Sequence, residues 1–528
     1  MTSWPVHEPH LLAWAVPICA ALGGAALLTR ALIAAAPGRG WTVVPRNDRW
    51  NRRVVAHFGG VPVLLAFFLV SFLLIRNISN LRLVLLAAAM GAVGMVDDLV
   101  DLRASLKTVG QLIVAGAAVW AGVVQPLTAS HAVNVAFTVF WIVAITNAFN
   151  LLDNMDGLAA GVAIIALAQV AWLDGTGITA MLSLTLAGAL GGFLIFNFYP
   201  ARVFMGDVGS LAVGCFLACA SISADAHLSS LSSILLVPLL IFFMPLFDTL
   251  LVSVTRRLRG QPISQGGIDH TSHRLVLIGM SESRAVLLLY AISLVAAMMA
   301  VLWKYSWGTL GAGIVALFLV ASTLLWLYLA KLQVPADASA RRVALPQLLE
   351  GLVTRISAVT LDSFLILLAL YFAYVIRFGR LDEALLGRWL FSGALFVAIK
   401  LTALVLCGAY RESWEISSSV DVSRIAGAMA LSAVGLIAIS ALLPESKDPG
   451  VLTVVLDMAL ASVLLVACRA SHHILDNLLR NSMAQPRRRA VVTEFPQARE
   501  LLKPAVGGGV SLAFRAEAKP RPEAQNEF

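Results

Sequence analysis

The stretch AVNVAFTVFWIVAITNAFNLLDNMDGLAAGVAIIALAQVAW, residues 132–172, joins two apolar runs through a short polar loop. Each run is close to the length of a helix that crosses a bilayer, which takes about 20 residues. The loop between them, NLLDNMDG, places two aspartates and two asparagines directly beside the apolar runs. This pattern predicts a pair of membrane-spanning helices with polar groups gathered at one surface of the membrane.

The rest of the chain continues this apolar pattern. Hydrophobic residues make up 59% of the 528 residues and charged residues only 13%, against roughly 45–50% and 25% in an average soluble chain. This composition excludes soluble globular, disordered and fibrous proteins. Apolar runs of helical length fall at about 11–36, 57–75, 81–97, 108–124, 132–150, 157–173, 178–197, 208–224, 230–255, 285–303, 308–331, 355–376, 389–409, 422–443 and 451–468. We therefore expect an all-α polytopic integral membrane protein.

Changes in composition divide the chain into four parts. About eleven helices in residues 1–331 form a membrane core, and a polar stretch at 332–352 is expected to be a cytoplasmic linker. About four more helices follow in a membrane module at 353–470, and residues 471–528 form a basic cytoplasmic tail.

The net charge of +8 is explained by membrane topology. Basic residues gather in cytoplasmic loops, and five arginines follow the first apolar run within residues 39–53. This distribution predicts an N-terminus outside the cytoplasm and a C-terminus inside it. We expect membrane lipid as a partner and no nucleic acid. The five cysteines show no zinc-binding spacing, and we expect them to be small packing residues.

Acidic residues are rare between Arg49 and Phe247, and their positions are informative. Six of the eight lie at predicted cytoplasmic ends of helices, in three separate segments: Asp97, Asp98, Asp101, Asp153, Asp156 and Asp207. Like charges three or four residues apart destabilise a helix, and a helix C-terminus disfavours anions. The first three carboxylates are therefore either solvated loop groups or ligands of a cation. Asp153, Asp156 and Asp207 could be simple helix N-caps, or they could belong to the same site.

A later cytoplasmic loop, RRLRGQPISQGGIDHTSHRL at 256–275, supplies basic and imidazole groups. His270 and His273 with Asp269 could hold a metal, although one His-x-x-His pair is weak evidence. Cationic and imidazole donors suit a diphosphate equally well.

Together these residues favour phosphoryl-group transfer at the membrane surface. Mg²⁺ takes one or two carboxylates and completes its shell with water and substrate phosphates, and this chemistry requires charge neutralisation above all. The alternatives are a lipid-linked sugar transporter or flippase, whose ionisable groups would lie nearer the bilayer midplane, and a scaffold without activity.

Five motifs, in order, resemble those of the polyprenyl-phosphate N-acetylhexosamine-1-phosphate transferases, the undecaprenyl-phosphate GlcNAc-1-phosphate transferase-like glycosyltransferase family 4. They are PRNDRWNRRVVAHFGG, MVDDLVDL followed by Lys107 and Gln111, NAFNLLDNMDG, NFYPARVFMGDVGSL and DHTSHRL. The family also includes the phospho-N-acetylmuramoyl-pentapeptide transferases. The resemblance implies a location in the cytoplasmic (inner) membrane of a bacterium. The resemblance implies that the phosphate of undecaprenyl phosphate attacks the β-phosphate of a UDP-sugar, with Mg²⁺ or Mn²⁺ as cofactor, and that UMP leaves.

The resemblance also implies roles for individual residues. The catalytic residues would be Asp97, Asp98, Asp153, Asp156, Asp207, His270 and His273. The metal would be held by Asp207 and Asp98. The substrate-binding residues would be Lys107, Asn150, Asn197, Phe204 and Arg274. Asp248 matches the family as well, and an aspartate within an apolar helix is a functional candidate.

Some positions depart from the family pattern. Ser272 stands where the hexosamine-1-phosphate branch usually has another histidine, and the triple-histidine pattern of the muramoyl-pentapeptide branch is missing. We therefore favour initiation of a glycan or cell-envelope polysaccharide, with a phospho-MurNAc-pentapeptide transferase as the alternative. A homodimer is the one protein assembly expected. The last four helices are similar to the membrane part of polysaccharide-biosynthesis dehydratase/epimerase proteins, but without the glycines of a dinucleotide-binding turn, so we expect no NAD.

Overall fold

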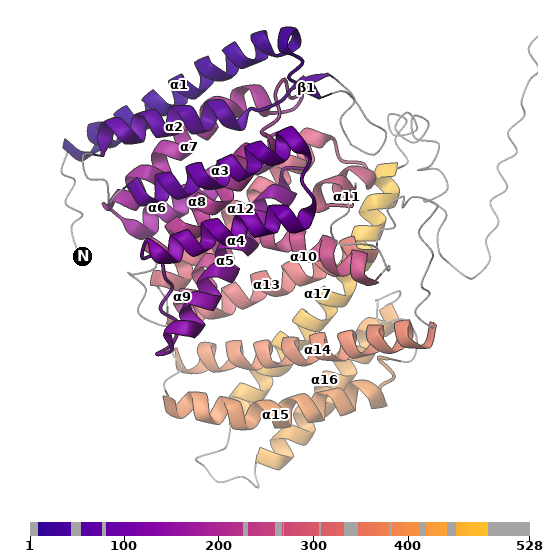
Figure 1. Cartoon of the computed structure of the whole chain (residues 1–528). Helices are drawn as coiled ribbons and strands as arrows, with labels where there is room; N and C mark the ends of the chain where they lie inside the picture. The colour runs from indigo at the N-terminus through magenta and orange to yellow at the C-terminus, as the bar shows by residue number, and fades with distance from the viewer. Residues whose placement is uncertain are drawn as a thin grey trace, which may run out of the picture. The chain divides into compact units, whose positions relative to one another are not determined.

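A computed structural model describes most of the chain (Figure 1). The described residues are 9–43, 54–75, 81–224, 231–258, 267, 269–305, 308–331, 347–379, 383–410, 419–440 and 450–483. The expected basic tail from residue 484 onward, most of the expected linker and four of the five arginines in the first cytoplasmic loop lie outside them. The boundaries of the four expected parts of the chain stay predictions.

Helices make up nearly all of the described structure. In chain order the elements are α1 (Pro9–Arg39), β1 (Thr42–Val43), β2 (Val55–Ala56), α2 (Gly60–Leu74), α3 (Arg82–Val100), α4 (Ala104–Trp120), α5 (His131–Leu152), α6 (Leu158–Asp174), α7 (Ile178–Asn197), α8 (Gly206–Ala224), α9 (Leu231–Ile241), α10 (Phe243–Leu258), α11 (Thr271–Leu277), α12 (Glu282–Tyr305), α13 (Gly308–Lys331), α14 (Gln347–Phe378), α15 (Glu383–Leu406), α16 (Ser419–Ser440) and α17 (Val451–Met483).

The helices confirm a multi-pass membrane protein. Among the described residues, ten helices are long and apolar enough to cross a membrane, and the bent pair α9–α10 would be an eleventh span. Three shorter apolar helices (α2, α4 and α6) and the apolar part of α15 account for the remaining apolar runs of the sequence. The all-α fold class is therefore correct.

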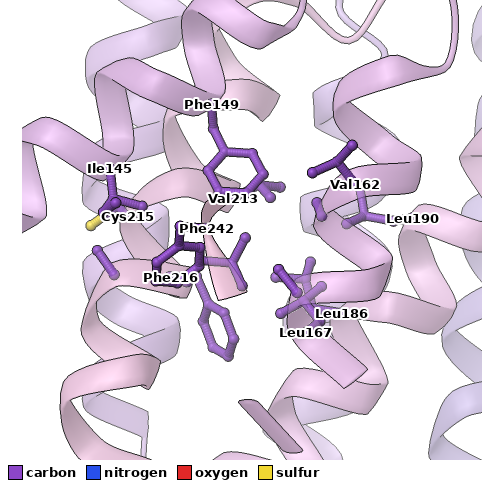
Figure 2. Close-up of a cluster of buried hydrophobic side chains, with 14 of the residues drawn as sticks. Ile145, Phe149, Val162, Leu167, Leu186, Leu190, Val213, Cys215, Phe216 and Phe242 are labelled. Atoms are coloured by element: carbon purple, nitrogen blue, oxygen red, sulfur yellow. The ribbon is translucent and has the colours of Figure 1, made fainter. Parts of the chain in front are cut away.

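Helix α8 lies at the centre of the part formed by α1–α13. It packs against α2, α3, α5, α6 and α7, and its sequence GDVGSLAVGCFLACASISA consists largely of small residues. Lipid tails are as apolar as leucine, so helices in a membrane associate mainly through close packing, which small residues permit. Figure 2 shows Phe216 and Cys215 of α8 among side chains of the surrounding helices. The expectation that Cys215 and Cys219 are packing residues agrees with their complete burial.

Two glycines allow the closest approaches to α8. A Cβ atom on Gly94 of α3 would lie 2.2 Å from the carbonyl oxygen of Asp207, and one on Gly60 of α2 would lie 2.3 Å from the Cα of Gly209. No other residue type could occupy these positions without moving the helices apart. The contact at Gly94 brings the C-terminal turn of α3, with its aspartates, against the start of α8.

A small amount of β-structure supports the same region, which the sequence pattern does not predict. Strands β1 and β2 are antiparallel, with Thr42 opposite Ala56, and Ala56 also forms a parallel bridge with Val203. The ladder continues where Gly59 and Gly60 donate their N–H groups to the carbonyl oxygens of Phe204 and Met205, at 2.8 and 2.7 Å. The first motif of the sequence therefore holds the loop that leads into α8.

Four helices differ clearly from the expected bounds. The apolar run at 230–255 forms two helices, α9 and α10, bent by 80° at their junction. Pro245 has no N–H to donate to Ile241, which interrupts the helix at this point. Helix α14 begins at Gln347, inside the expected linker, and α17 continues to Met483, beyond the expected end of the last apolar run.

Among the described residues of helices α14–α17, two buried ion pairs join the helices. Lys400 of α15 lies 2.5 Å from Asp457 of α17, and both side chains are at most 1% exposed. In the second pair, Arg469 donates to Asp362 at 2.5 Å, and Tyr410 donates to the same carboxylate oxygen. Charged groups inside a membrane are costly unless they are paired, so these pairs specify which faces of the helices meet.

We expect Lys400→Met to lower the free energy of unfolding by about 2–4 kcal/mol, because Asp457 would be left buried without a cation. The double variant Lys400→Met/Asp457→Leu is expected to recover most of this loss. Unfolding of the purified protein in detergent micelles measures both effects. The control is Arg424→Ala, which removes a partly exposed pair with Asp421 and should change stability by less than about 0.5 kcal/mol. A double variant as unstable as the single one would contradict this account.

Candidate active site

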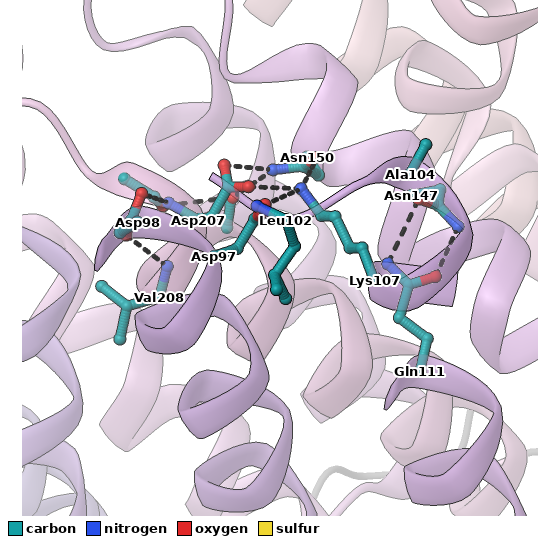
Figure 3. A network of polar contacts seen from close by, with 12 residues as sticks. Asp97, Asp98, Leu102, Ala104, Lys107, Gln111, Asn147, Asn150, Asp207 and Val208 are labelled. Atoms are coloured by element: carbon teal, nitrogen blue, oxygen red, sulfur yellow. Dashed lines mark hydrogen bonds and ion pairs between the residues drawn. The ribbon is translucent and has the colours of Figure 1, made fainter. Parts of the chain in front are cut away.

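The ammonium of Lys107 lies among three oxygen-bearing side chains, from three other helices (Figure 3). Its Nζ atom is 2.9 Å from Oδ2 of Asp97 on α3 and 2.9 Å from Oδ1 of Asn150 on α5. It also forms a short ion pair with Oδ2 of Asp207 at the start of α8. We call Asp97, Asp98, Lys107, Asn150 and Asp207 the acid centre.

Amide side chains fix the positions of the groups around Lys107. Asn150 donates through Nδ2 to Oδ1 of Asp207 and to Oγ of Ser210, both at 2.9 Å. One turn earlier on α5, Asn147 and Gln111 exchange two hydrogen bonds between α5 and α4, at 2.8 and 3.2 Å. The polar stripe of NAFNLLDNMDG therefore does more than cap a helix, because Asn147 and Asn150 join α4, α5 and α8.

Asp98 accepts hydrogen bonds from the backbone at the start of α8. Its Oδ1 accepts the N–H of Asp207 and its Oδ2 the N–H of Val208, both at 3.0 Å. These N–H groups have no partner within their own helix, so the carboxylate acts as a cap supplied by α3. Oδ1 also lies 3.2 Å from Nε2 of His57.

His57 is a residue of this site that the sequence reasoning missed. It lies in the first motif, RRVVAHFGG, to which no specific role was assigned. The backbone N–H of His57 donates to the carbonyl oxygen of Trp41 at 2.9 Å. A histidine two residues before a pair of glycines was the available signal, but the sequence does not show that it faces Asp98. By contrast Asp101, the third aspartate of its segment, is exposed and outside the acid centre.

The loop between α5 and α6 is tied to the loop between α7 and α8. Asp156 accepts the N–H of Ala201 at 2.8 Å. Asn197 accepts the N–H of Gly157 at 3.1 Å and donates to the carbonyl oxygen of Val203 at 2.9 Å. These bonds give Asp156 and Asn197 supporting positions beside the acid centre, and their predicted contacts with substrate stay predictions.

Asp153 begins the same loop and is partly buried near other carboxylates. Burial raises the pKa of Asp153 to about 7, and the negative charges of Asp207, Asp98 and Asp156 add to this rise. The carboxyl of Asp153 therefore changes its charge near neutral pH in the folded protein.

This pKa predicts a pH dependence of stability. The folded pKa lies above the ordinary value of 3.8, so ionisation of Asp153 destabilises the fold, and stability should fall as the pH rises from about 4 to about 7. Asp153→Asn should be more stable than the unchanged protein at pH 8, by about 2–4 kcal/mol, with the difference vanishing below about pH 4. Thermal unfolding in EDTA across this range measures it. An equal difference at every pH would contradict the assignment.

A second polar group, which we call the histidine network, surrounds Asp248 of α10. Asp248 is 1% exposed; its Oδ2 lies 2.8 Å from Nδ1 of His270, and its Oδ1 accepts the N–H of Thr271 at 2.6 Å. Ser272 donates to Oδ1 of Asn154 at 2.6 Å. Asn154 follows Asp153 directly, so the histidine network and the loop beside the acid centre are linked through one dipeptide.

Two predicted site residues of this loop face the protein interior: Arg274, predicted to bind substrate, and His273, predicted to be catalytic. Arg274 is fully buried, and its guanidinium donates to the carbonyl oxygens of Asp269 and Leu329 at 2.7 and 2.6 Å. Burial lowers the pKa of His273 to about 3, with the charge of His270 as a second cause, so His273 is neutral at physiological pH. Their roles toward a diphosphate stay predictions, and in this structure Arg274 holds the loop in place.

An ion pair between Arg256 and Asp269 fixes the start of the loop. Asp269 accepts two hydrogen bonds from Arg256, at 2.8 and 2.6 Å, and these bonds lower the pKa of its carboxyl below the ordinary value even though burial opposes this. Asp269 is therefore ionised and paired with Arg256. Among the described residues, no group of three or more His, Cys, Asp or Glu side chains is placed to hold a metal ion, so the open alternative of a metal on Asp269, His270 and His273 gains no support.

Comparisons with known proteins agree with the motifs around the acid centre. The sequence profile of glycosyl transferase family 4 matches residues 80–225, which include every member of the acid centre. A probable undecaprenyl-phosphate N-acetylglucosaminyl 1-phosphate transferase of Bacillus subtilis is 33% identical over 278 residues, which are 49% of this chain and 76% of the relative.

Two further relatives represent the two branches considered above. The decaprenyl-phosphate N-acetylglucosaminephosphotransferase of Mycobacterium tuberculosis is 33% identical over 39% of this chain and 58% of the relative. The phospho-N-acetylmuramoyl-pentapeptide-transferase of Pelotomaculum thermopropionicum is 33% identical over 45% of this chain and 80% of the relative. The resemblance inferred from the five motifs is thus confirmed: the chain belongs to glycosyl transferase family 4.

Proposed function

We propose that this protein transfers a sugar-1-phosphate, N-acetylhexosamine-1-phosphate in particular, from a UDP-sugar to undecaprenyl phosphate and releases UMP. The acid centre is the observation that carries the proposal. It gathers three carboxylates, an ammonium and an amide at the N-terminus of α8, from four helices of a membrane protein. The names of the relatives from Bacillus subtilis and Mycobacterium tuberculosis describe this kind of transfer.

The reaction forms one bond and breaks one bond. An oxygen of the lipid phosphate attacks the β-phosphorus of the UDP-sugar, and the bond from that phosphorus to the oxygen shared with the α-phosphate breaks. That oxygen leaves with UMP, so no group of the protein becomes covalently attached. The protein has to bring two anionic phosphates together, and the cationic Lys107 and the N–H groups at the start of α8 are suited to this.

The acid centre also fits a divalent cation. Mg²⁺ prefers oxygen ligands and takes one or two carboxylates, completing its shell with water and substrate phosphates. Asp207 would hold it together with Asp97 or Asp98, and Asp97 and Asp207 already face one shared cation, Lys107. When bound, Mg²⁺ or Mn²⁺ would neutralise negative charge on the diphosphate. The absence of a three-residue metal group among the described residues is compatible with such a site.

The histidine network would orient one further donor. With Nδ1 of His270 held by Asp248 at 2.8 Å, Nε2 is the ring nitrogen left to meet the sugar diphosphate. We place the acid centre on the cytoplasmic side, with the N-terminus outside and the C-terminus inside, because basic residues concentrate in the loops on that side. The oligomeric state and the pathway served by the product stay predictions.

A transfer assay tests the proposal. Purified full-length protein in detergent is incubated with undecaprenyl phosphate, Mg²⁺ and one UDP-sugar at a time, and UMP is measured. We expect UMP with UDP-GlcNAc or another UDP-N-acetylhexosamine, and none without the lipid phosphate. UDP-MurNAc-pentapeptide is included because one relative is a phospho-N-acetylmuramoyl-pentapeptide-transferase. Activity with this donor alone would show that the protein is a phospho-MurNAc-pentapeptide transferase instead. No UMP with any of the donors would contradict the proposed function.

A further inference from the structure

Lys107 lies in surroundings that would suit a divalent cation. Its Nζ contacts only oxygens in the acid centre: Oδ2 of Asp97, Oδ1 of Asn150 and Oδ2 of Asp207. The side chain is 16% exposed, so the ammonium is largely removed from water. Carboxylate and amide oxygens of this kind are the ligands that Mg²⁺ takes in proteins.

The charges of Asp97 and Asp207 explain why a cation lies between these two carboxylates. Asp97 and Asp207 carry two negative charges that converge on one point, and Lys107 supplies a single positive charge. Two like charges brought together at low local dielectric repel strongly. A divalent cation would balance both carboxylates, whereas the ammonium balances one. The ammonium and a divalent cation therefore compete for the same oxygens.

The two carboxylates are held in place by other contacts. Asp97 accepts the N–H of Leu102 at 2.8 Å, and Asp207 accepts from Asn150 at 2.9 Å. The close approach of Gly94 to the backbone of Asp207 fixes the distance between α3 and α8. Removing the ammonium therefore leaves two carboxylates that stay near each other.

We propose that Lys107 is a tethered cation that competes with a divalent metal for Asp97 and Asp207. When the metal takes these carboxylates, the ammonium is released and becomes available to the phosphates of the substrate. One residue thereby shields the carboxylates from each other before the metal binds and neutralises substrate charge afterwards. The inference rests on the proposed function, because it assumes a metal at the acid centre.

The test measures metal binding directly, without substrates. Full-length protein in detergent is titrated with Mn²⁺, and free Mn²⁺ is followed by electron paramagnetic resonance. We expect Lys107→Met and Lys107→Gln each to bind Mn²⁺ about tenfold more tightly than the unchanged protein, because a competing charge has been removed. Lys107→Arg keeps the charge and should stay within about threefold of the unchanged protein. In the transfer assay, both neutral variants should lose about 10²-fold in kcat.

The matched control is Lys304→Met, which removes the same type of side chain from α12, where it contacts the ring of Trp172. It should leave Mn²⁺ binding unchanged. Equal or weaker binding of Mn²⁺ by both neutral variants, while the unchanged protein still releases UMP, would overturn the tethered cation and leave the proposed function standing. Failure of the unchanged protein to release UMP with any donor overturns the proposed function instead. Thermal unfolding of each variant shows whether it is folded. Because two neutral variants are measured, a folding defect in one of them leaves the other to test the proposal.

Discussion

Replacing Asp207 with asparagine is expected to lower kcat for sugar-1-phosphate transfer by about 10³-fold or more, while the protein stays folded. Asp207 contacts Lys107 and Asn150. Its replacement removes one negative charge from the acid centre, and this charge would hold the cations that neutralise the two substrate phosphates. Electrostatic groups that act on the developing charge of a reaction typically account for losses of this size. The size of asparagine is nearly that of aspartate, so the helix start should be preserved.

The measurement is steady-state release of UMP at saturating lipid phosphate, together with thermal unfolding of the variant. Asp101→Asn is the matched control, because Asp101 belongs to the same acidic segment as Asp97 but is exposed. Its φ of 55° is one that asparagine tolerates well. We expect less than a twofold change in kcat for Asp101→Asn. A similar loss in both variants would mean that the overall negative charge matters rather than the acid centre.

Asp248→Asn is expected to lower kcat by about 10²-fold with a small change in KM for the UDP-sugar. The carboxylate accepts the N–H of Thr271 and pairs with Nδ1 of His270, whereas an amide has one acceptor and one donor group. The amide must therefore turn its donor toward one of these partners, which breaks a bond or forces His270 into the other tautomer. Asp248 is a positioning residue in this account, and losses of ten- to a hundredfold are usual for groups that orient others.

Asp174→Asn provides the control for the second prediction. Asp174, the last residue of α6, accepts the N–H of Ala180 at 2.9 Å, at the start of α7. Its replacement should lower stability by about 1 kcal/mol through a weaker cap and leave kcat unchanged. The pH dependence of kcat separates positioning from folding, since Asp248→Asn should shift the profile and Asp174→Asn should not. An unshifted profile with full activity in Asp248→Asn would show that His270 needs no partner.

The helices could be predicted from the sequence because the bilayer restricts the composition and length of the segments that cross it. A chain segment that crosses a bilayer must be apolar and about 20 residues long, so α3, α5 and α7 can be located by composition alone. The same rule cannot locate a break inside an apolar run. The bend between α9 and α10 depends on the missing N–H of Pro245, and many prolines in membrane helices cause no such break.

The acid centre could be predicted in outline because charge is rare in this chain. The positions of Asp97, Asp98 and Asp207 at helix ends and the family resemblance of Lys107 point to this site, and the structure brings the four residues together. Their separate tasks could not be predicted, since Asp98 accepts backbone N–H groups while Asp97 pairs with Lys107. The inward direction of Arg274 was equally hidden, because a basic residue in a polar loop gives no sign of whether it faces substrate or protein.

The central claim is that the β-phosphate travels with the sugar to the lipid. It is tested most directly with UDP-GlcNAc that carries one radioactive label in the β-phosphate and a second in the sugar, incubated with the purified protein, Mg²⁺ and undecaprenyl phosphate. The account predicts that both labels enter the lipid fraction in equal amounts and that unlabelled UMP is released. Sugar label in the lipid with the phosphate label left in UDP would contradict it, because that outcome is transfer of the sugar alone.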